Sequence, residues 1–234
     1  MIKALLGALL LFPAAAEDKT FTVSGTVTLP GPLPPARPNK KLEGDQACAA
    51  LHAGVPPTDN LVVDVNGRVR WAFVYVKKGL EGKEFEPPKV PVMIDQRGCV
   101  YEPHLVGAQV GQPVNFRNAD PVLHNVHGLP FQNKEFNVGQ VQGAVSGVTF
   151  TAAEIPVKVV CNVHPWMGAY VCVVDHPFFA VTDAAGTFTI RNLPPGNYTL
   201  GVWHEGLDTL DGSNELRVAV KADAVADFVM KKKS

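Results

Sequence analysis

The chain has 234 residues, with 21 basic and 22 acidic side chains and a formal net charge of −1. A charge so close to zero argues against nucleic acid or an acidic membrane surface as the main partner. The length suits one large or two ordinary domains, each able to bury a core. Strand-like patterns dominate, and 21 glycines with 20 prolines supply many turns, so we predict an all-β fold.

The first residues have the three parts of a secretory signal peptide. Lys3 is followed by an apolar run from Ala4 to Phe12 and then by three alanines. This pattern predicts a signal peptide over residues 1–16, cleaved before Glu17. The apolar run is too short to span a bilayer, and no later segment reads as transmembrane. We therefore expect an exported, periplasmic protein with no membrane span.

Residues 17–88 predict strands at both ends. Residues 21–29 alternate in the manner of a strand and stop at a Pro-Gly-Pro run. A proline-rich segment that carries Cys48 follows, and we expect it to be a loop as far as residue 60. Two further strands, 61–65 and 68–77, flank an Asn-Gly pair, which is a strong hairpin signal. A stretch rich in Gly, Glu and Pro then predicts a linker that ends near residue 88.

Metal-binding side chains of three kinds gather in the middle of the chain. The loop Cys161-Asn-Val-His164-Pro-Trp-Met167 lies 37 residues after His124. A thiolate and a thioether favour copper over hard cations, and two imidazoles with one thiolate form the trigonal set of a blue-copper centre. Strand-like runs on both sides of the loop predict a tight turn that brings its donors together. These residues therefore predict a copper site.

Residues 89–175 resemble the cupredoxin family, and most closely the amicyanins. Both share the short Cys-x-x-His-x-x-Met loop and a His-Asn-Val-His run at the first histidine. The resemblance implies a Greek-key β-sandwich that holds one type 1 copper ion, with a methionine sulfur as the weak axial ligand. It also implies that Asn125 ties the two ligand loops together and hydrogen-bonds towards the sulfur. The implied copper ligands are His124, Cys161, His164 and Met167.

The resemblance also implies a function. A copper ion held by four side chains has no vacant position for a substrate, so we expect electron transport and not an enzyme. By analogy with amicyanin, a redox partner such as a dehydrogenase or a cytochrome would dock at the exposed edge of His164, near Pro165 and Trp166. The alternative is a copper-binding or delivery protein of the cell envelope that recognises its recipient through a β-sandwich. An enzymatic site would require Met167 to be off the metal.

The other cysteines suit an exported protein. Cys48 and Cys99 each lie in a turn-rich segment near a strand end, and we expect them to form a disulfide. Cys172 lies among valines, so we expect a buried free thiol that packs as a small apolar side chain. A bridge between Cys172 and Cys99 is the alternative.

Other polar residues near the motif have simpler interpretations. Asn118 and Asp120 are expected to form an Asx-type turn that aims His124, since no partner acid suggests catalysis. His127 follows His124 by three residues, so it should face the other side of the strand and be structural. The remaining histidines are expected at the surface or at caps, and they would form a second metal site only if the domains brought them together. They are His104, His176 and His204.

Residues 176–234 have a different sequence pattern from the copper domain. The run Thr-Asp-Ala-Ala-Gly-Thr-Phe at 182–188, followed by Leu-Pro-Pro-Gly-Asn-Tyr at 193–198, resembles the carboxypeptidase regulatory-like domain. The resemblance implies a transthyretin-like β-sandwich that serves binding or spacing. About five strands are readable here, fewer than a closed sandwich needs. Either the strands of residues 17–88 complete this sandwich and the copper domain is inserted in it, or the chain has three consecutive units.

Overall fold

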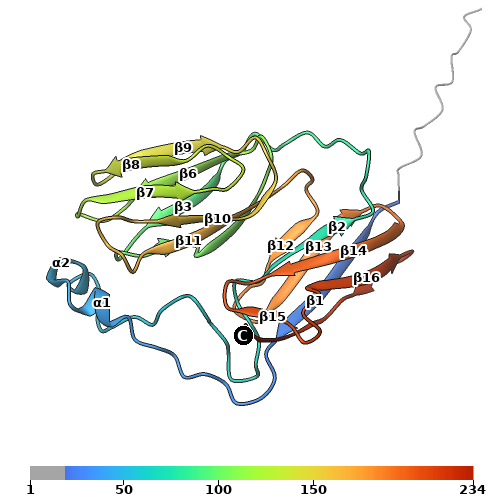
Figure 1. The fold of residues 1–234 in the computed structure, drawn as a ribbon, viewed down its shortest axis with the longest axis horizontal. Coiled ribbons are helices and arrows are strands. Elements are labelled where there is room, and N and C mark those ends of the chain that lie inside the picture. Colours follow the sequence, from blue (N-terminus) through green and yellow to red (C-terminus); the bar gives the residue numbers. More distant parts are fainter. Residues whose placement is uncertain (1–18, 234) are drawn as a thin grey trace, which may run out of the picture.

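The computed structural model of the chain describes residues 19–233, so the predicted signal peptide lies outside the described part. The fold is all-β, as predicted, with two β-sandwiches side by side (Figure 1). The helices of the described part are two short ones, α1 (Lys40–Glu43) and α2 (Gln46–Ala49). Neither has the length or apolar character to cross a membrane.

The inserted sandwich contains β3 to β11. Its strands are β3 (Val92–Gln96), β4 (Tyr101–Glu102), β5 (Leu105–Gln109), β6 (Pro113–Asn118), β7 (His124–Leu129), β8 (Phe136–Gln140), β9 (Val145–Thr149), β10 (Glu154–Val160) and β11 (Gly168–Val174). One sheet has the order β5-β11-β10-β7-β8, and the other has the order β4-β3-β6-β9. The start of β7, the end of β10 and the start of β11 therefore lie together at one edge of the first sheet.

The outer sandwich contains strands from both ends of the chain. They are β1 (Phe21–Thr28), β2 (Phe73–Lys78), β12 (Phe179–Val181), β13 (Thr187–Leu193), β14 (Gly196–Trp203), β15 (Leu207–Thr209), β16 (Glu215–Val220), β17 (Ala224–Val225) and β18 (Phe228–Lys232). β1 lies between β13 and β18, and β2 lies between β12 and β14. The N-terminal strands thus share both sheets of the C-terminal sandwich, and the inserted sandwich interrupts it.

The sequence of β1 explains its central place. Val23 and Val27 are wholly buried in the core, because residues four apart on a strand face the same side. Between them, Gly25 lies against the backbone of Ala226, where any Cβ atom would collide with the carbonyl oxygen. Only glycine allows the chain that follows β16 to approach β1 so closely.

Two sequence predictions for residues 30–77 are wrong in detail. The predicted loop contains α1 and α2, whose first turns are capped by the side chains of Asn39 and Asp45. The predicted hairpin is reduced to one isolated bridge between Val63 and Val69, and β2 starts only at Phe73. Trp71 has a φ of 65°, a left-handed conformation that interrupts strand pairing before β2.

The two sandwiches meet at a small apolar cluster that includes Phe73, Leu105 and Cys172. Cys172 is a free thiol and wholly buried there, so the alternative bridge to Cys99 is not formed. Burial raises the pKa of this thiol, which keeps it protonated. Cys172 therefore acts as a small apolar side chain at the junction.

Candidate metal centre

Three of the four predicted ligands form one buried cluster at the end of the inserted sandwich. His124 is the first residue of β7, while Cys161 and His164 lie in the loop between β10 and β11. The Nδ1 atoms of the two histidines are 2.9 Å apart, and the Cys161 Sγ is 3.9 Å from the His164 Nδ1. The exposed fractions of His124 and Cys161 are 0% and 2%.

These distances suit a single metal ion. Imidazole nitrogens and thiolate sulfurs bind zinc, an ion of similar size, at about 2.0 Å and about 2.3 Å. Two nitrogens on one ion must then lie within about 4 Å, and a nitrogen and a sulfur within about 4.3 Å. Both measured separations meet these limits. The donor set, one soft thiolate and two imidazoles, is the one that copper prefers.

The loop between β10 and β11 folds back on itself. The backbone N–H of Met167 donates to the carbonyl of His164, and the N–H of Cys161 donates to the carbonyl of Met167, at 2.9 and 3.3 Å. Met167 is 2% exposed and belongs to the same apolar cluster as Cys161. The predicted axial ligand is thus buried in the core that surrounds the predicted thiolate.

Asn125 joins the two ligand loops. Its backbone N–H points at the Cys161 Sγ, 3.5 Å away, and its side-chain oxygen accepts a 2.6 Å hydrogen bond from the backbone N–H of Asn162. Its side-chain amide also donates to Asn137 on β8. Such outer contacts orient ligands and tune a metal almost as much as the ligands do.

Asp120 holds the other side of His124. Its Oδ2 atom accepts a hydrogen bond from the His124 Nε2, at 2.9 Å, so in the neutral ring the proton stays on Nε2 and the Nδ1 lone pair is available to a metal. Asn118 accepts from the backbone N–H of Asp120, which is the predicted Asx turn. The sequence analysis does not predict the hydrogen bond that His124 donates to Asp120, although the spacing of four residues between them could have indicated it.

The charges in the metal-free cluster shift two of the three ligands, Cys161 and His164, towards the forms that bind a metal. Burial opposes protonation of His124, but hydrogen bonds to Asp120 and Cys161 raise its pKa to about 8. Burial also opposes ionisation of Cys161, but hydrogen bonds from His124 and backbone N–H groups lower its thiol pKa overall. Burial and the nearby charge of His124 lower the pKa of His164. A thiolate and a neutral imidazole are the forms that bind a metal, so His124 must release a proton when a metal binds below pH about 8.

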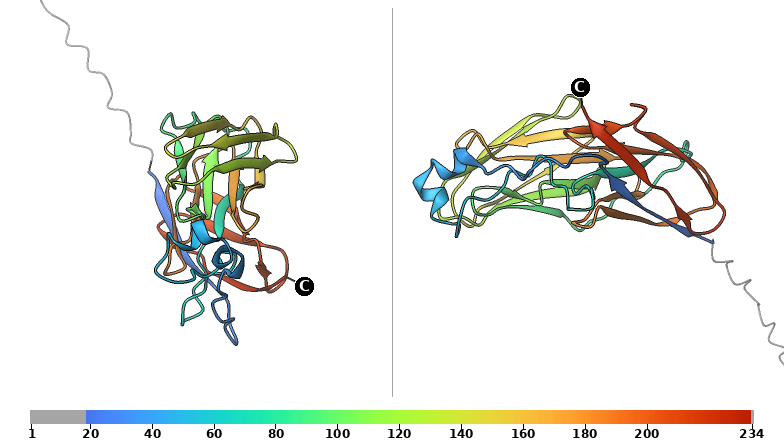
Figure 2. Two further views of the ribbon diagram at one scale, coloured as in Figure 1. Left: turned by 90° about the vertical axis from the view of Figure 1, so that its left-hand side faces the viewer. Right: turned by 90° about the horizontal axis from the view of Figure 1, so that it is seen from below.

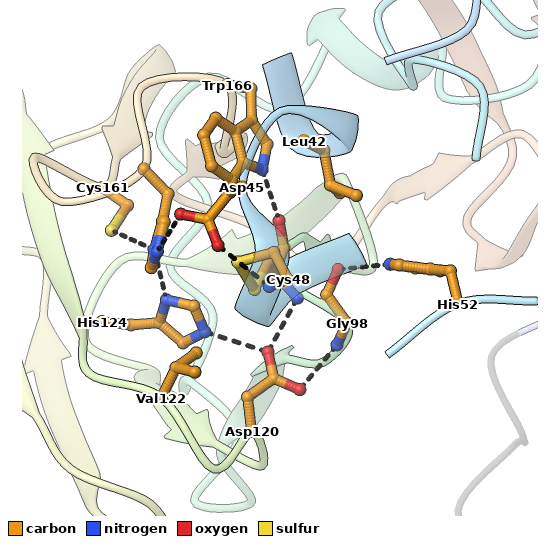
Figure 3. The surroundings of a disulfide bond; sticks show 12 residues. Leu42, Asp45, Cys48, His52, Gly98, Asp120, Val122, His124, Cys161 and Trp166 are labelled. Carbon is orange, nitrogen blue, oxygen red and sulfur yellow. Dashed lines mark hydrogen bonds and ion pairs between the residues drawn. A yellow bond between two sulfur atoms is a disulfide. The ribbon is translucent and has the colours of Figure 1, made fainter. Parts of the chain in front are cut away.

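The prediction that one edge of His164 is exposed is wrong. His164 is only 6% exposed, because residues 39–52, here called the cover segment, lie over it. Figure 3 shows Leu42, Asp45 and Cys48 of the cover segment beside His124 and Cys161, and Figure 2 shows α1 and α2 at the end of the molecule distant from the outer sandwich. Asp45 Oδ2 lies 3.9 Å from the His164 Nε2, and Leu42 is buried in the core of the inserted sandwich.

The predicted pair Cys48 and Cys99 forms the disulfide that fixes the cover segment. Its Cα atoms are 5.7 Å apart across a sequence separation of 51 residues. A hydrogen bond between the His52 Nε2 and the Gly98 carbonyl adds a second attachment, at 2.7 Å. A loop motif read alone gives no sign of such a cover, since the covering residues come from far away in the sequence.

The other histidines have structural partners. His127 contacts Glu135 and Asn162, and His104 contacts Glu205, which also accepts a hydrogen bond from Tyr170. Within residues 19–233, each group of three potential metal-binding side chains lies around His124 and His164, and none includes another histidine. The described part thus gives no second metal cluster at the junction of the sandwiches.

Comparisons with known proteins give one family match and a set of similar solved structures. The model of the carboxypeptidase regulatory-like domain matches residues 139–231, which begin in β8 and run through the C-terminal strands of the outer sandwich. Among curated proteins, none matches this chain.

Similar solved structures include copper proteins. One is the copper-containing nitrite reductase NirK from Thermus scotoductus SA-01, with 23% identity over 41% of this chain and 24% of that chain, at a TM-score of 0.35. Another is a purple cupredoxin from Nitrosopumilus maritimus, with 24% identity over 35% and 98% of the two chains, at 0.32. A Cu(I) amicyanin variant has 22% identity over 43% and 97%, at 0.33. This chain therefore spans about a quarter of the nitrite reductase.

Proposed function

We propose that the chain is a periplasmic type 1 copper protein that carries electrons and is not an enzyme. The main support is the convergence of the two Nδ1 atoms, 2.9 Å apart, with the Cys161 sulfur 3.9 Å from one of them. A copper ion there would be held by His124, Cys161, His164 and Met167. Bound copper would supply one-electron redox chemistry, and the surrounding residues would fix its geometry and exclude water.

The proposed partner is a redox protein, such as a dehydrogenase or a cytochrome, that docks near His164. Since the cover segment lies over this histidine, the partner would contact the outer face of that segment, where Lys40 and Lys41 are exposed. Electron-transfer complexes have small and weak interfaces, so a short segment can provide a large share of the contact.

Copper loading of the mature, disulfide-intact protein tests the proposal. We expect one Cu(II) ion per chain, an intense thiolate-to-copper absorption band, and fast, reversible voltammetry. A chain that takes up no Cu(II), or that binds it without colour, would contradict the assignment of Cys161 as ligand.

The second candidate is a copper-holding or delivery protein of the cell envelope. The burial of His164 favours it, because the cover segment lengthens the path from the metal to an electron-transfer partner. Rapid loss of Cu(I) to a chelator together with slow, irreversible voltammetry would support delivery. Slow metal loss with fast voltammetry would support the electron carrier.

A further inference from the structure

The Cys48–Cys99 disulfide lies directly beside the candidate copper ligands (Figure 3). Both sulfurs are buried, and they lie within 4.8 Å of a ring nitrogen of His164. Cys99 has a φ of 54°, a left-handed conformation that is rare for a residue with a side chain. Such strain costs about 1–3 kcal/mol and persists only where the surrounding contacts fix the backbone. Contacts of the Cys99 backbone must therefore hold this conformation in place.

One contact leads from Cys99 to His124. The backbone N–H of Cys99 donates to Asp120 Oδ2 at 2.8 Å, and the same oxygen accepts from the His124 Nε2 at 2.9 Å. The preceding N–H, of Gly98, donates to the other carboxylate oxygen at 2.6 Å. The left-handed conformation at residues 98 and 99 points both N–H groups at one carboxylate, which in turn orients the first imidazole.

Two further contacts lead to His164. The Cys99 carbonyl accepts a 3.0 Å hydrogen bond from the Trp166 Nε1, and the Trp166 ring packs against the His164 ring with centroids 5.0 Å apart. On the other half of the disulfide, the Cys48 N–H donates to Asp45, whose second oxygen faces the His164 Nε2. A single intermediate side chain thus links the disulfide to each imidazole: Asp120 to His124, and Trp166 or Asp45 to His164.

We propose that the Cys48–Cys99 disulfide is a positioning element for both imidazoles, so that high-affinity copper binding depends on its formation. This inference rests on the proposed function, because it takes copper as the ion. With the bond closed, Cys99 orients Asp120 and Trp166, and the cover segment shields His164. Reduction by a dithiol gives Cys48 and Cys99 one proton and one electron each and leaves the reductant as a disulfide. The cover segment then loses the disulfide that joins it to the inserted sandwich.

The variant Cys48→Ser in the full chain tests this role, with Cys172→Ala as the matched control. Outer contacts to metal ligands typically change affinity about 10–100-fold. We expect Cys48→Ser to weaken Cu(II) binding by that factor in chelator competition and to shift the visible and EPR spectra. Cys172→Ala should change neither. A Cys48→Ser protein with lower thermal stability but unchanged affinity and spectra would show a merely structural staple and overturn the proposal.

A second variant tests the connection without breaking the disulfide. Trp166→Phe keeps a ring beside His164 and removes the donor to the Cys99 carbonyl. We expect a smaller spectral shift than for Cys48→Ser, and almost no added shift when both changes are combined, because the contact acts through the same path. Fully additive shifts would contradict the proposal. Trp166→Phe also gives a readout if Cys48→Ser does not fold.

A measurement on metal-free protein separates this inference from the proposed function. Amide hydrogen exchange of residues 39–52 and 98–99 is compared between the oxidised wild type and Cys48→Ser. We expect faster exchange in both segments of the variant, with no change in β13, where the outer sandwich serves as the internal reference. Unchanged exchange would overturn the inference. Failure of the wild type to bind copper, with the exchange difference present, would refute the proposed function alone.

Discussion

Both sandwiches bury histidines, but the ring nitrogens of these histidines meet different neighbours. In the inserted sandwich, the Nδ1 atoms of His124 and His164 face each other beside a thiol. In the outer sandwich, His176 donates from Nε2 to the Val76 carbonyl and accepts at Nδ1 from the Phe178 N–H. His204 accepts at Nδ1 from the Gly206 N–H.

The comparison shows that burial does not by itself identify a metal ligand. His176 has both nitrogens engaged by backbone groups, so it has no lone pair left for an ion. His124 has a carboxylate on one nitrogen and an open second nitrogen that points at other donors. The free nitrogen and what it faces distinguish a ligand from a structural histidine.

The largest effect that we expect concerns how the outer sandwich is built. A fragment of residues 176–234 lacks β1 and β2, which lie inside its two sheets. The unpaired strands on both sides of each gap should leave it unfolded. Circular dichroism and urea titration of the fragment measure this. A cooperative transition in the fragment alone would contradict the described division into an outer and an inserted sandwich.

The next prediction concerns a substitution in the inserted sandwich alone. Asp120→Asn preserves the size of the side chain but replaces one of its two acceptor oxygens by an NH2 group. The single remaining oxygen cannot accept from both His124 and the backbone N–H groups of residues 98–99. We expect copper affinity to fall about 10–100-fold in chelator competition. The control is Asp95→Asn, which removes a surface ion pair with Arg117 on β6 of the same sandwich. Equal affinities for the two variants would refute the role of Asp120.

The histidines of the two sandwiches should affect stability with opposite signs in metal-free protein. Burial lowers the pKa of His204 to about 4, so the unfolded chain takes up a proton at higher pH than the folded one. Stability is then lost as the pH falls from about 6.5 towards 4, by up to about 3 kcal/mol. His124, whose pKa is raised to about 8, contributes stability below pH about 6.5 that is lost as the pH rises through 8.

Urea unfolding between pH 4.5 and 9 measures both effects. His204→Gln should flatten the acidic side of the curve, and His124→Gln should flatten the basic side. Each variant is the control for the other, since each leaves the opposite limb unchanged. If either variant shifts the whole curve without changing its slope, the assigned pKa direction is wrong.

The sequence predicts those parts of the molecule whose information is local. The spacing of Cys161, His164 and Met167 within one loop predicts a cluster, and the alternation around Val23 and Val27 predicts a buried strand. The number of readable strands in residues 176–234, too few for a closed sandwich, also leads to the alternative in which residues 17–88 complete the outer sandwich. These features depend on residues that are adjacent in sequence or follow a strand period.

There is a physical reason why the cover segment could not be predicted from the sequence. Residues 39–52 show no clear strand or helix period, and their place depends on one disulfide, the burial of Leu42 and the contact of His52 with Gly98. The sequence suggests the pairing of Cys48 with Cys99 but not what the disulfide brings over His164. For the same reason the exposure of His164 could not be read from its loop.

The most direct test of the account compares two buried thiols of the inserted sandwich, Cys161 in the candidate metal centre and Cys172 at the junction with the outer sandwich. Cys161→Ser and Cys172→Ala are loaded with Cu(II), and their visible absorption and EPR spectra are recorded beside those of the wild type. We expect Cys161→Ser to lose the intense thiolate-to-copper band completely and Cys172→Ala to keep it unchanged. Survival of that band in Cys161→Ser would contradict the copper centre proposed at His124, Cys161 and His164.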